Sequence, residues 1–148
     1  MDPAARKFKR PESVLVVVAT RTGRVLLMQR RDDPSFWQSV TGSLRWDEHR
    51  PRDAAARELQ EETGLPADGL IDLHWVQHFP ILPAWRSRYA PEVQENVEHA
   101  FALWLPRERP VVLNPDEHLA FGWFGFREAA AKASSWSNRG VIERLATE

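Results

Sequence analysis

One segment near the middle of the chain, residues 51–63, constrains the fold more than any other. It reads PRDAAARELQEET, in which strong helix formers fill most positions. Pro51 stands where the first turn of a helix tolerates proline, and Gly64 stands where a C-terminal cap belongs. The pattern predicts an α-helix over residues 51–63.

This helix carries three carboxylates at helical spacing. Glu58, Glu61 and Glu62 occupy positions i, i+3 and i+4, so their side chains share one face. Like charges at this spacing repel each other, and Arg57, four residues before Glu61, offsets part of that repulsion. An acidic face of this kind is also typical of a solvent-exposed surface, so the surrounding sequence has to decide between the two interpretations.

The residues before the helix favour a metal site. Gly42 can adopt backbone conformations that are closed to other residues, and a loop there can direct carbonyl oxygens toward a cation. Mg²⁺ prefers hard oxygen ligands and usually keeps water and substrate phosphates in its shell. We therefore expect bound Mg²⁺, with Mn²⁺ as the alternative ion, which would neutralise polyphosphate charge and help generate a hydroxide nucleophile.

Strand-forming segments surround the predicted helix. The strands expected from apolar, β-branched runs are residues 13–19, 24–29, 36–40, 71–79, 99–105 and 119–126, the first two joined as a hairpin. Two more helices are expected at residues 127–133 and 137–145, the second capped by Ser137. The proline-containing stretch between the fourth and fifth strands is expected to be a long, functional loop. The pattern predicts an α+β fold, an α/β/α sandwich with a mixed β-sheet between helices.

Composition and charge limit the class of protein. A length of 148 residues predicts a single domain spanning residues 1–148, and 43% hydrophobic with 28% charged residues is typical of a soluble globular chain. The absence of cysteine excludes disulfides and thiolate metal sites. A net charge of -1 gives no field that drives binding to a nucleic acid polymer or a membrane. Residues 1–10 lack the apolar core of a secretory signal, so we expect a cytoplasmic protein.

The stretch from Gly42 to Leu65, GSLRWDEHRPRDAAARELQEETGL, resembles the Nudix signature GX5EX7REUXEEXGU, in which U is apolar. The second half of the signature matches at every fixed position, namely Arg57, Glu58, Leu59, Glu61, Glu62, Gly64 and Leu65. The first half supplies Gly42 and Glu48, but eight residues rather than seven separate Glu48 from Arg57. One extra residue in the loop before the helix is the simplest explanation, and it leaves the role of Glu48 open.

The resemblance implies a Nudix fold and a role for individual residues. Its metal ligands would be Glu58, Glu61, Glu62 and Glu117. Its catalytic set would be Glu58, Glu61, Glu62 and Arg57, with the arginine holding a glutamate in place by an ion pair. The implied substrate-binding residues are Lys9, Arg30, Thr41, Phe79, Pro80, Ile81, Leu82 and Ser135. Taken alone, Glu117 is also compatible with a surface loop and Ser135 with the start of a helix.

Stretches outside the signature, among them KRPESVLVVV, LLMQRRDDPSFWQSVTGS, EHLAFGWF and SWSNR, narrow the resemblance. They are similar to bacterial Nudix hydrolases that remove pyrophosphate from dihydroneopterin triphosphate in folate biosynthesis, and whose homologues also take dATP. The resemblance implies that a metal-activated water attacks a phosphorus atom of a pterin or nucleoside triphosphate. The chain has seven tryptophans, most of which we expect in the core, with one or two available to stack on a flat heterocycle.

Two other functions stay open at this point. One is a housecleaning pyrophosphohydrolase acting on dATP or on an oxidised purine triphosphate. The other is a non-catalytic Nudix-like nucleotide sensor, which the extra residue in the signature favours and the intact acidic cluster opposes. The sequence gives no indication of the oligomeric state.

Overall fold

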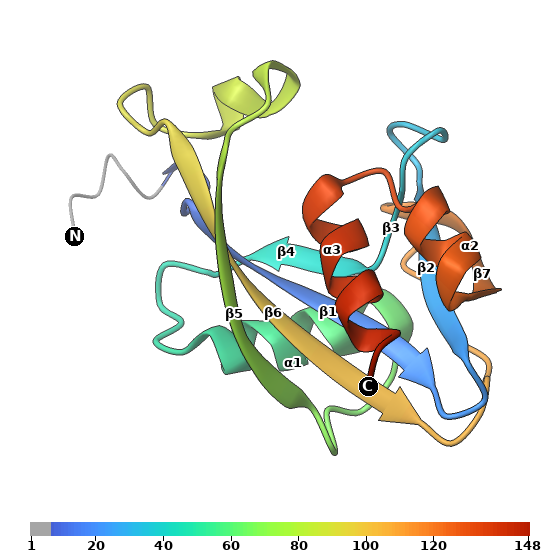
Figure 1. The fold of residues 1–148 in the computed structure, drawn as a ribbon. Helices are drawn as coiled ribbons and strands as arrows, with labels where there is room; N and C mark the ends of the chain where they lie inside the picture. Colours follow the sequence, from blue (N-terminus) through green and yellow to red (C-terminus); the bar gives the residue numbers. More distant parts are fainter. Residues whose placement is uncertain (1–6) are drawn as a thin grey trace.

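The structure, a computed structural model, describes residues 7–148 and consists of a mixed β-sheet covered by helices on both faces (Figure 1). The strands are β1 (Glu12–Thr20), β2 (Arg24–Arg30), β3 (Trp37–Gln38), β4 (Val40–Ser43), β5 (Ile71–Pro80), β6 (Glu95–Leu105) and β7 (His118–Gly125). The helices are α1 (Pro51–Thr63), α2 (Phe126–Lys132) and α3 (Trp136–Leu145), with a 3₁₀ helix, η2 (Pro83–Arg88), between β5 and β6.

Strand β1 is the centre of the sheet, whose main path is β3-β2-β1-β6-β5. It runs parallel to β6 along its whole length and antiparallel to β2 and β4, so the sheet is mixed as expected. Residues 13–20 of β1 are all buried. A strand that is covered on both faces typically has a nearly continuous apolar sequence, as β1 has. The side chains of β1 alternate between the two faces and therefore enter two separate cores.

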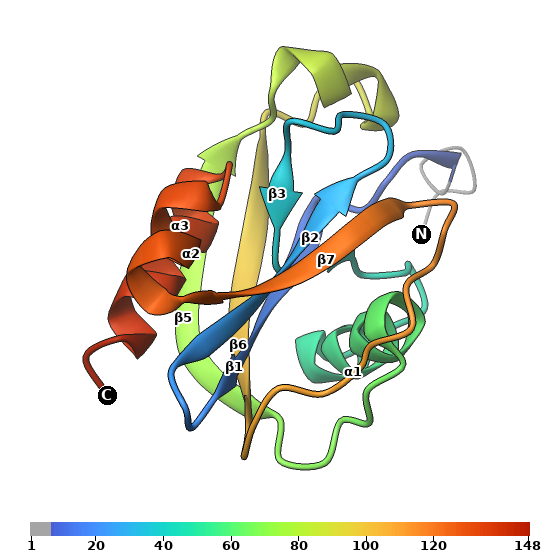
Figure 2. The same cartoon turned by 90° about the vertical axis from the view of Figure 1, so that its right-hand side faces the viewer.

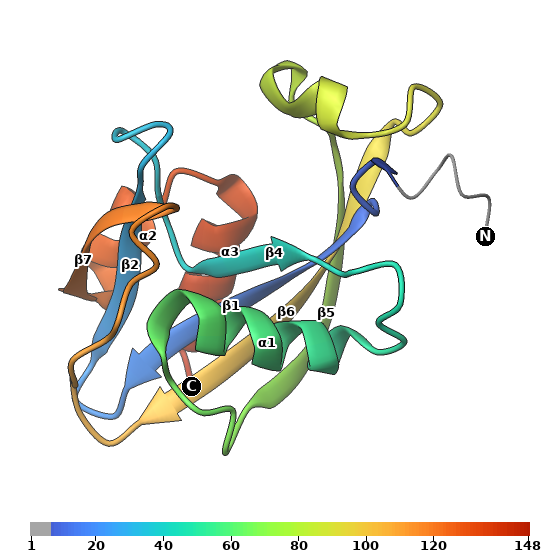
Figure 3. The same ribbon diagram turned by 180° about the vertical axis from the view of Figure 1, so that it is seen from behind.

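Each core lies under a different layer of helices (Figure 2). On one face α1 packs Leu59 and two alanines against the even-numbered valines of β1. On the other face α3 contributes Val141, Ile142 and Leu145 and α2 contributes two alanines to a core that also contains Leu15 and Val17 of β1. Seen from behind, α1 lies across the sheet on the side opposite to α3 (Figure 3). The predicted α/β/α sandwich is confirmed.

Two strands, β4 and β2, pair with different parts of the same edge of β1. This arrangement determines where the candidate site lies. Residues 13–16 pair with β4, whereas only Ala19 pairs in register with Val25 of β2. Strand β2 pairs with β7 along its whole length and with the short β3 at Met28 and Gln29. The sheet therefore opens between β4 and the β2–β7 pair, and α1 follows directly on the loop after β4.

The structure corrects several predicted boundaries. The single strand expected at residues 36–40 is two strands, β3 and β4, separated by Ser39, whose amide N–H donates to Asn138 Oδ1 at 2.8 Å. Strand β6 begins at Glu95, because its polar first residues Glu95 and Asn96 pair with β5 before the pairing with β1 starts at Val97. The expected loop contains η2. Ser137 is not the cap of α3: it lies inside the helix, and Ser135 Oγ accepts the hydrogen bond from the Asn138 amide.

The expectation that most tryptophans are core residues was wrong. None of the seven is buried, and Trp136 is 59% exposed. Trp37, Trp75, Trp104 and Trp123 pack against the edges of the two cores, because an indole ring is too large to be enclosed easily between the β-sheet and its helices. Within residues 7–148 no helix is long and apolar enough to cross a membrane. The expectation for residues 1–10 falls partly on residues 1–6, which lie outside the described part.

Candidate functional site

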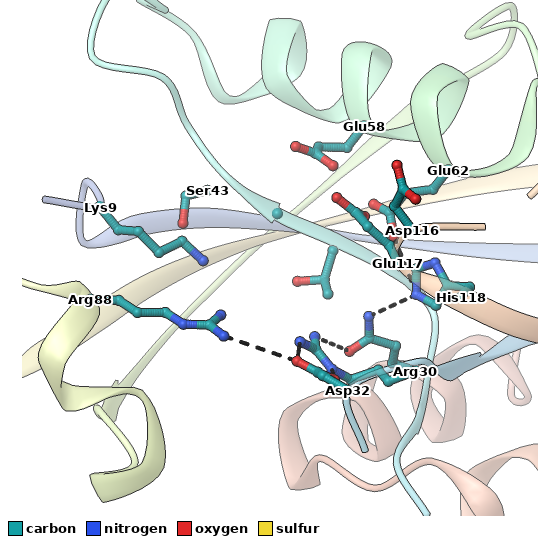
Figure 4. Close-up of a pocket in the computed structure, with 13 residues that line it drawn as sticks. Lys9, Arg30, Asp32, Ser43, Glu58, Glu62, Arg88, Asp116, Glu117 and His118 are labelled. Carbon is teal, nitrogen blue, oxygen red and sulfur yellow. Dashed lines mark hydrogen bonds and ion pairs between the residues drawn. The ribbon is translucent and has the colours of Figure 1, made fainter. Parts of the chain in front are cut away.

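A cleft of about 420 Å³ lies where α1, β4 and the start of β7 meet (Figure 4). The glutamates Glu58, Glu62 and Glu117 lie on one side of it, and Lys9, Arg30 and Arg88 lie on the other. Its lining residues are Lys9, Arg30, Asp32, Gln38, Thr41, Gly42, Ser43, Glu58, Glu62, Arg88, Asp116, Glu117 and His118. Residues separated by more than a hundred positions in the sequence thus share one concave surface.

The acidic side is built from α1 and from the residue before β7. Oxygen atoms of Glu62 and Glu117 and a ring nitrogen of His118 lie within 4.8 Å of one another. Glu62 is 1% exposed, and its Oε2 atom has no hydrogen-bond partner in the described part of the chain. Burial, followed by the charge of Glu58, raises the pKa of Glu62 well above its ordinary value. An orphaned carboxylate oxygen beside a second carboxylate fits a divalent cation, which would reverse that pKa shift.

Gly42 is required here by space rather than by backbone conformation. A Cβ atom at this position would lie 2.3 Å from Cδ of Glu58 and 2.5 Å from its Oε1. Strand β4 therefore passes directly against the Glu58 carboxylate. The sequence interpretation assigned the glycine to loop flexibility, whereas the structure places it in a strand where a larger side chain would displace the Glu58 carboxylate.

Arg57 holds the acidic residues around it. Its Nη2 and Nε atoms donate to the two carboxylate oxygens of Glu48 at 2.8 and 3.0 Å, and its Nη1 donates to Glu58 Oε1 at 2.6 Å. The side chains of Arg57, Glu48 and Glu58 are all at least four-fifths buried. The extra residue in the signature is thus absorbed by the loop before α1, and Glu48 still reaches the arginine.

Glu61 differs from the other two helix carboxylates. Its side chain is 42% exposed and pairs with Arg45 at 3.2 Å and with Arg57 at 3.3 Å, and it does not line the cleft. The structure brings Glu58, Glu62 and Glu117 together and leaves Glu61 at the rim.

The basic side consists of Lys9, Arg30 and Arg88. Burial, followed by the charges of Arg88 and Arg30, lowers the pKa of Lys9 below its ordinary value. Arg30 donates to both carboxylate oxygens of Asp32 at 2.6 and 2.7 Å. Guanidinium and ammonium groups gathered in this way suit phosphate oxygens. The sequence predicted Lys9 and Arg30; Arg88 was visible only as part of a local cluster of basic residues.

His118 lies between the two sides and is buried. Gln38 accepts a hydrogen bond from Arg30 through its Oε1 atom, so its amide nitrogen faces His118 Nε2 at 3.2 Å. Burial lowers the pKa of His118 to about 4, so the imidazole is neutral at neutral pH. Gln38 and His118 were not among the predicted site residues, because an isolated histidine in a sequence is more often structural.

A second cavity of about 460 Å³ adjoins the first. The two share the lining residues Lys9, Arg30, Gln38, Thr41, Gly42, Ser43 and Arg88. All of the predicted residues Phe79, Pro80, Ile81, Leu82 and Ser135 line this second cavity. Thr41 borders both spaces and its hydroxyl donates to the Val14 carbonyl at 3.1 Å. The sequence interpretation missed two buried polar residues of this cavity, Asn96 and Glu98.

Known proteins share both the sequence and the fold. The profile of the NUDIX domain matches residues 9–145. The dihydroneopterin triphosphate diphosphatase of Escherichia coli K12 is 49% identical over 143 residues, which cover 93% of each chain. The enzyme of the same name from Haemophilus influenzae is 40% identical, covering 93% of this chain and 89% of that one. The structure of the E. coli dihydroneopterin triphosphate pyrophosphohydrolase superimposes with a TM-score of 0.85 at 48% identity, covering 93% and 95% of the two chains.

Proposed function

The chain belongs to the Nudix family, and from that premise we propose that it is a Mg²⁺-dependent pyrophosphohydrolase that converts dihydroneopterin triphosphate to the monophosphate and pyrophosphate. The proposal includes a side activity on nucleoside triphosphates such as dATP, a place in folate biosynthesis and a cytoplasmic location. It also treats residues 1–148 as one catalytic domain.

The observation that carries this proposal is the continuity of the two cavities. Carboxylates lie at one end, the basic residues Lys9, Arg30 and Arg88 lie where the cavities meet, and a more apolar space lies at the other end. A substrate with a metal-binding triphosphate and a flat ring needs these three environments in this order. Small-molecule sites are typically concave, largely apolar and fixed by a few polar groups.

The carboxylates of Glu58, Glu62 and Glu117 would hold the divalent ions, with Glu61 available from the rim. When bound, such ions supply charge neutralisation and an activated water for displacement at phosphorus. Arg57 fixes the Glu58 carboxylate, and Lys9 steadies the phosphate chain together with the arginines.

The test is pyrophosphate release with Mg²⁺ from dihydroneopterin triphosphate, dATP and 8-oxo-dGTP at matched concentrations. We expect the pterin substrate to have the highest kcat/KM. A preference for dATP or 8-oxo-dGTP would instead assign the chain to nucleotide-pool housecleaning. Binding of a nucleotide without pyrophosphate release would indicate a sensor.

Variants link this activity to the cleft. Glu62→Gln should lower kcat by at least about a hundredfold, because a buried ligand oxygen is lost. Glu117→Ala should shift the Mg²⁺ titration to higher concentration. Glu143→Gln, an exposed carboxylate on α3, is the matched control and should behave as the unmodified protein. A folded Glu62→Gln variant with full activity would remove this residue from the mechanism.

A further inference from the structure

Strand β6 places two buried polar side chains in the second cavity. Asn96 is 4% exposed and Glu98 is 6% exposed, and both line that cavity. They stand two residues apart on the strand, so both project from the face that also carries α3. Neither was noticed in the sequence, because a strand beginning at Glu95 was not expected.

Both residues have an acceptor oxygen that finds no hydrogen-bond partner among residues 7–148. Asn96 Oδ1 and Glu98 Oε1 accept no hydrogen bond from any described residue. The Asn96 amide nitrogen is already used, since it donates to Ser13 Oγ at 2.6 Å. Burial raises the pKa of Glu98 to about 7, against a hydrogen bond from Ser137 that lowers it.

Such an arrangement is costly unless something supplies donors. A buried acceptor left unpaired loses the hydrogen bonds that water would give it, and a buried carboxylate loses more. The cavity is large enough for a ligand, and the missing groups are specifically N–H or O–H donors. A ligand that brings two neighbouring hydrogen-bond donors to the oxygens of Asn96 and Glu98 would remove this cost.

The surroundings indicate a flat ring as the source of those donors. Phe79 pairs in register with Asn96 across β5 and β6, and its ring meets that of Trp136 edge-on with centroids 6.0 Å apart. Both aromatic residues line the cavity with the polar pair. A heterocycle packed against this aromatic pair would turn its edge toward β6, while its phosphate chain reached the basic residues shared with the metal cleft.

We propose that Glu98, with Asn96 beside it, is the specificity-determining residue for the ring of the substrate and selects a 2-amino-4-oxopyrimidine edge. This edge, which pterins and guanine share, presents a ring N–H and an amino group side by side, and both can donate to one carboxylate. Adenine presents an acceptor nitrogen next to its amino group, and that acceptor would face the carboxylate unfavourably. The inference rests on the proposed function, because it concerns the ring of the same substrate.

The first test compares kcat/KM for dihydroneopterin triphosphate, dGTP and dATP in Glu98→Gln. We expect the values for the pterin and for dGTP to fall about tenfold to a hundredfold, mostly through KM, and the value for dATP to stay within about twofold. Glu95→Gln is the matched control, since Glu95 is an exposed carboxylate of the same strand and does not line the cavity. An unchanged ratio of pterin to dATP activity in Glu98→Gln would overturn the proposal.

A second test needs no substitution, so it holds even if the variant fails to fold. In the unmodified protein dGTP should be preferred over dITP by about tenfold, because dITP lacks only the 2-amino group. Equal kcat/KM values for dGTP and dITP would refute recognition of that edge.

The two proposals can fail separately. The affinities for neopterin and for guanosine, measured by fluorescence without metal, depend on recognition of the ring and not on the triphosphate. If guanosine binds in a Glu98-dependent manner and the pterin triphosphate is not hydrolysed, the proposed function fails and the edge recognition stands. If the pterin triphosphate is hydrolysed and Glu98→Gln binds neopterin as tightly as the unmodified protein, the edge recognition fails alone.

Discussion

Replacement of Gly42 by alanine should lower the catalytic rate strongly while changing the free energy of unfolding only slightly. The new Cβ atom would lie 2.3 Å from Glu58 Cδ, and ordinary contacts begin near 3.4 Å, so the carboxyl group has to move by about 1.1 Å. That movement would break the 2.6 Å hydrogen bond from Arg57 and displace Glu58 from the cleft. A misplacement of about 1 Å typically costs about a hundredfold in rate.

The same substitution should cost little stability. The atoms that the methyl group meets form the end of a flexible side chain, so we expect a loss of only about 1 kcal/mol, the low end of the range for overpacking. Pyrophosphate release over a Mg²⁺ titration measures the first effect, and urea unfolding measures the second. Gly125→Ala is the control, because no atom in the described part of the chain lies within 4 Å of its added Cβ. Activity of Gly42→Ala within about threefold of the unmodified protein would refute the argument.

Three further predictions concern other parts of the site. Glu48→Gln should lower the free energy of unfolding by about 1–3 kcal/mol and reduce turnover, because it weakens the paired contact with Arg57; unchanged urea unfolding would show that the loop residue is dispensable. The pKa of Glu98 rises from 4.5 in the unfolded chain to about 7 in the folded protein, so its contribution to stability is present below pH 4.5 and is lost as the pH rises through 7. Glu98→Gln should therefore gain stability relative to the unmodified protein between these pH values, by roughly 3 kcal/mol at most, and parallel pH profiles of unfolding would contradict this. Ser135→Ala should lower the stability by about 1 kcal/mol through loss of the α3 cap, and it should also raise KM if the hydroxyl contacts the substrate; an unchanged melting temperature would exclude the capping role.

The sequence alone was sufficient for the features that depend on local periodicity. Helix α1 begins and ends at the predicted residues 51 and 63, and Gly64 caps it in the left-handed region with φ 74°. The apolar, β-branched run at residues 13–19 predicted the strand β1, and the strands around the predicted helices predicted the mixed sheet between helical layers. These features are decided by the repeat of side chains along one element, which can be read directly from neighbouring residues.

Only the tertiary structure decided how the site is put together. It showed that Gly42 is required by the Glu58 carboxylate, that Glu48 reaches Arg57 despite the inserted residue, and that Glu61 remains at the rim. It also brought Glu98 of β6 to the wall of a cavity bordered by η2 and α3. The physical reason is that burial and partnership of a polar group depend on segments far apart in the chain, and no local pattern records which of them will meet.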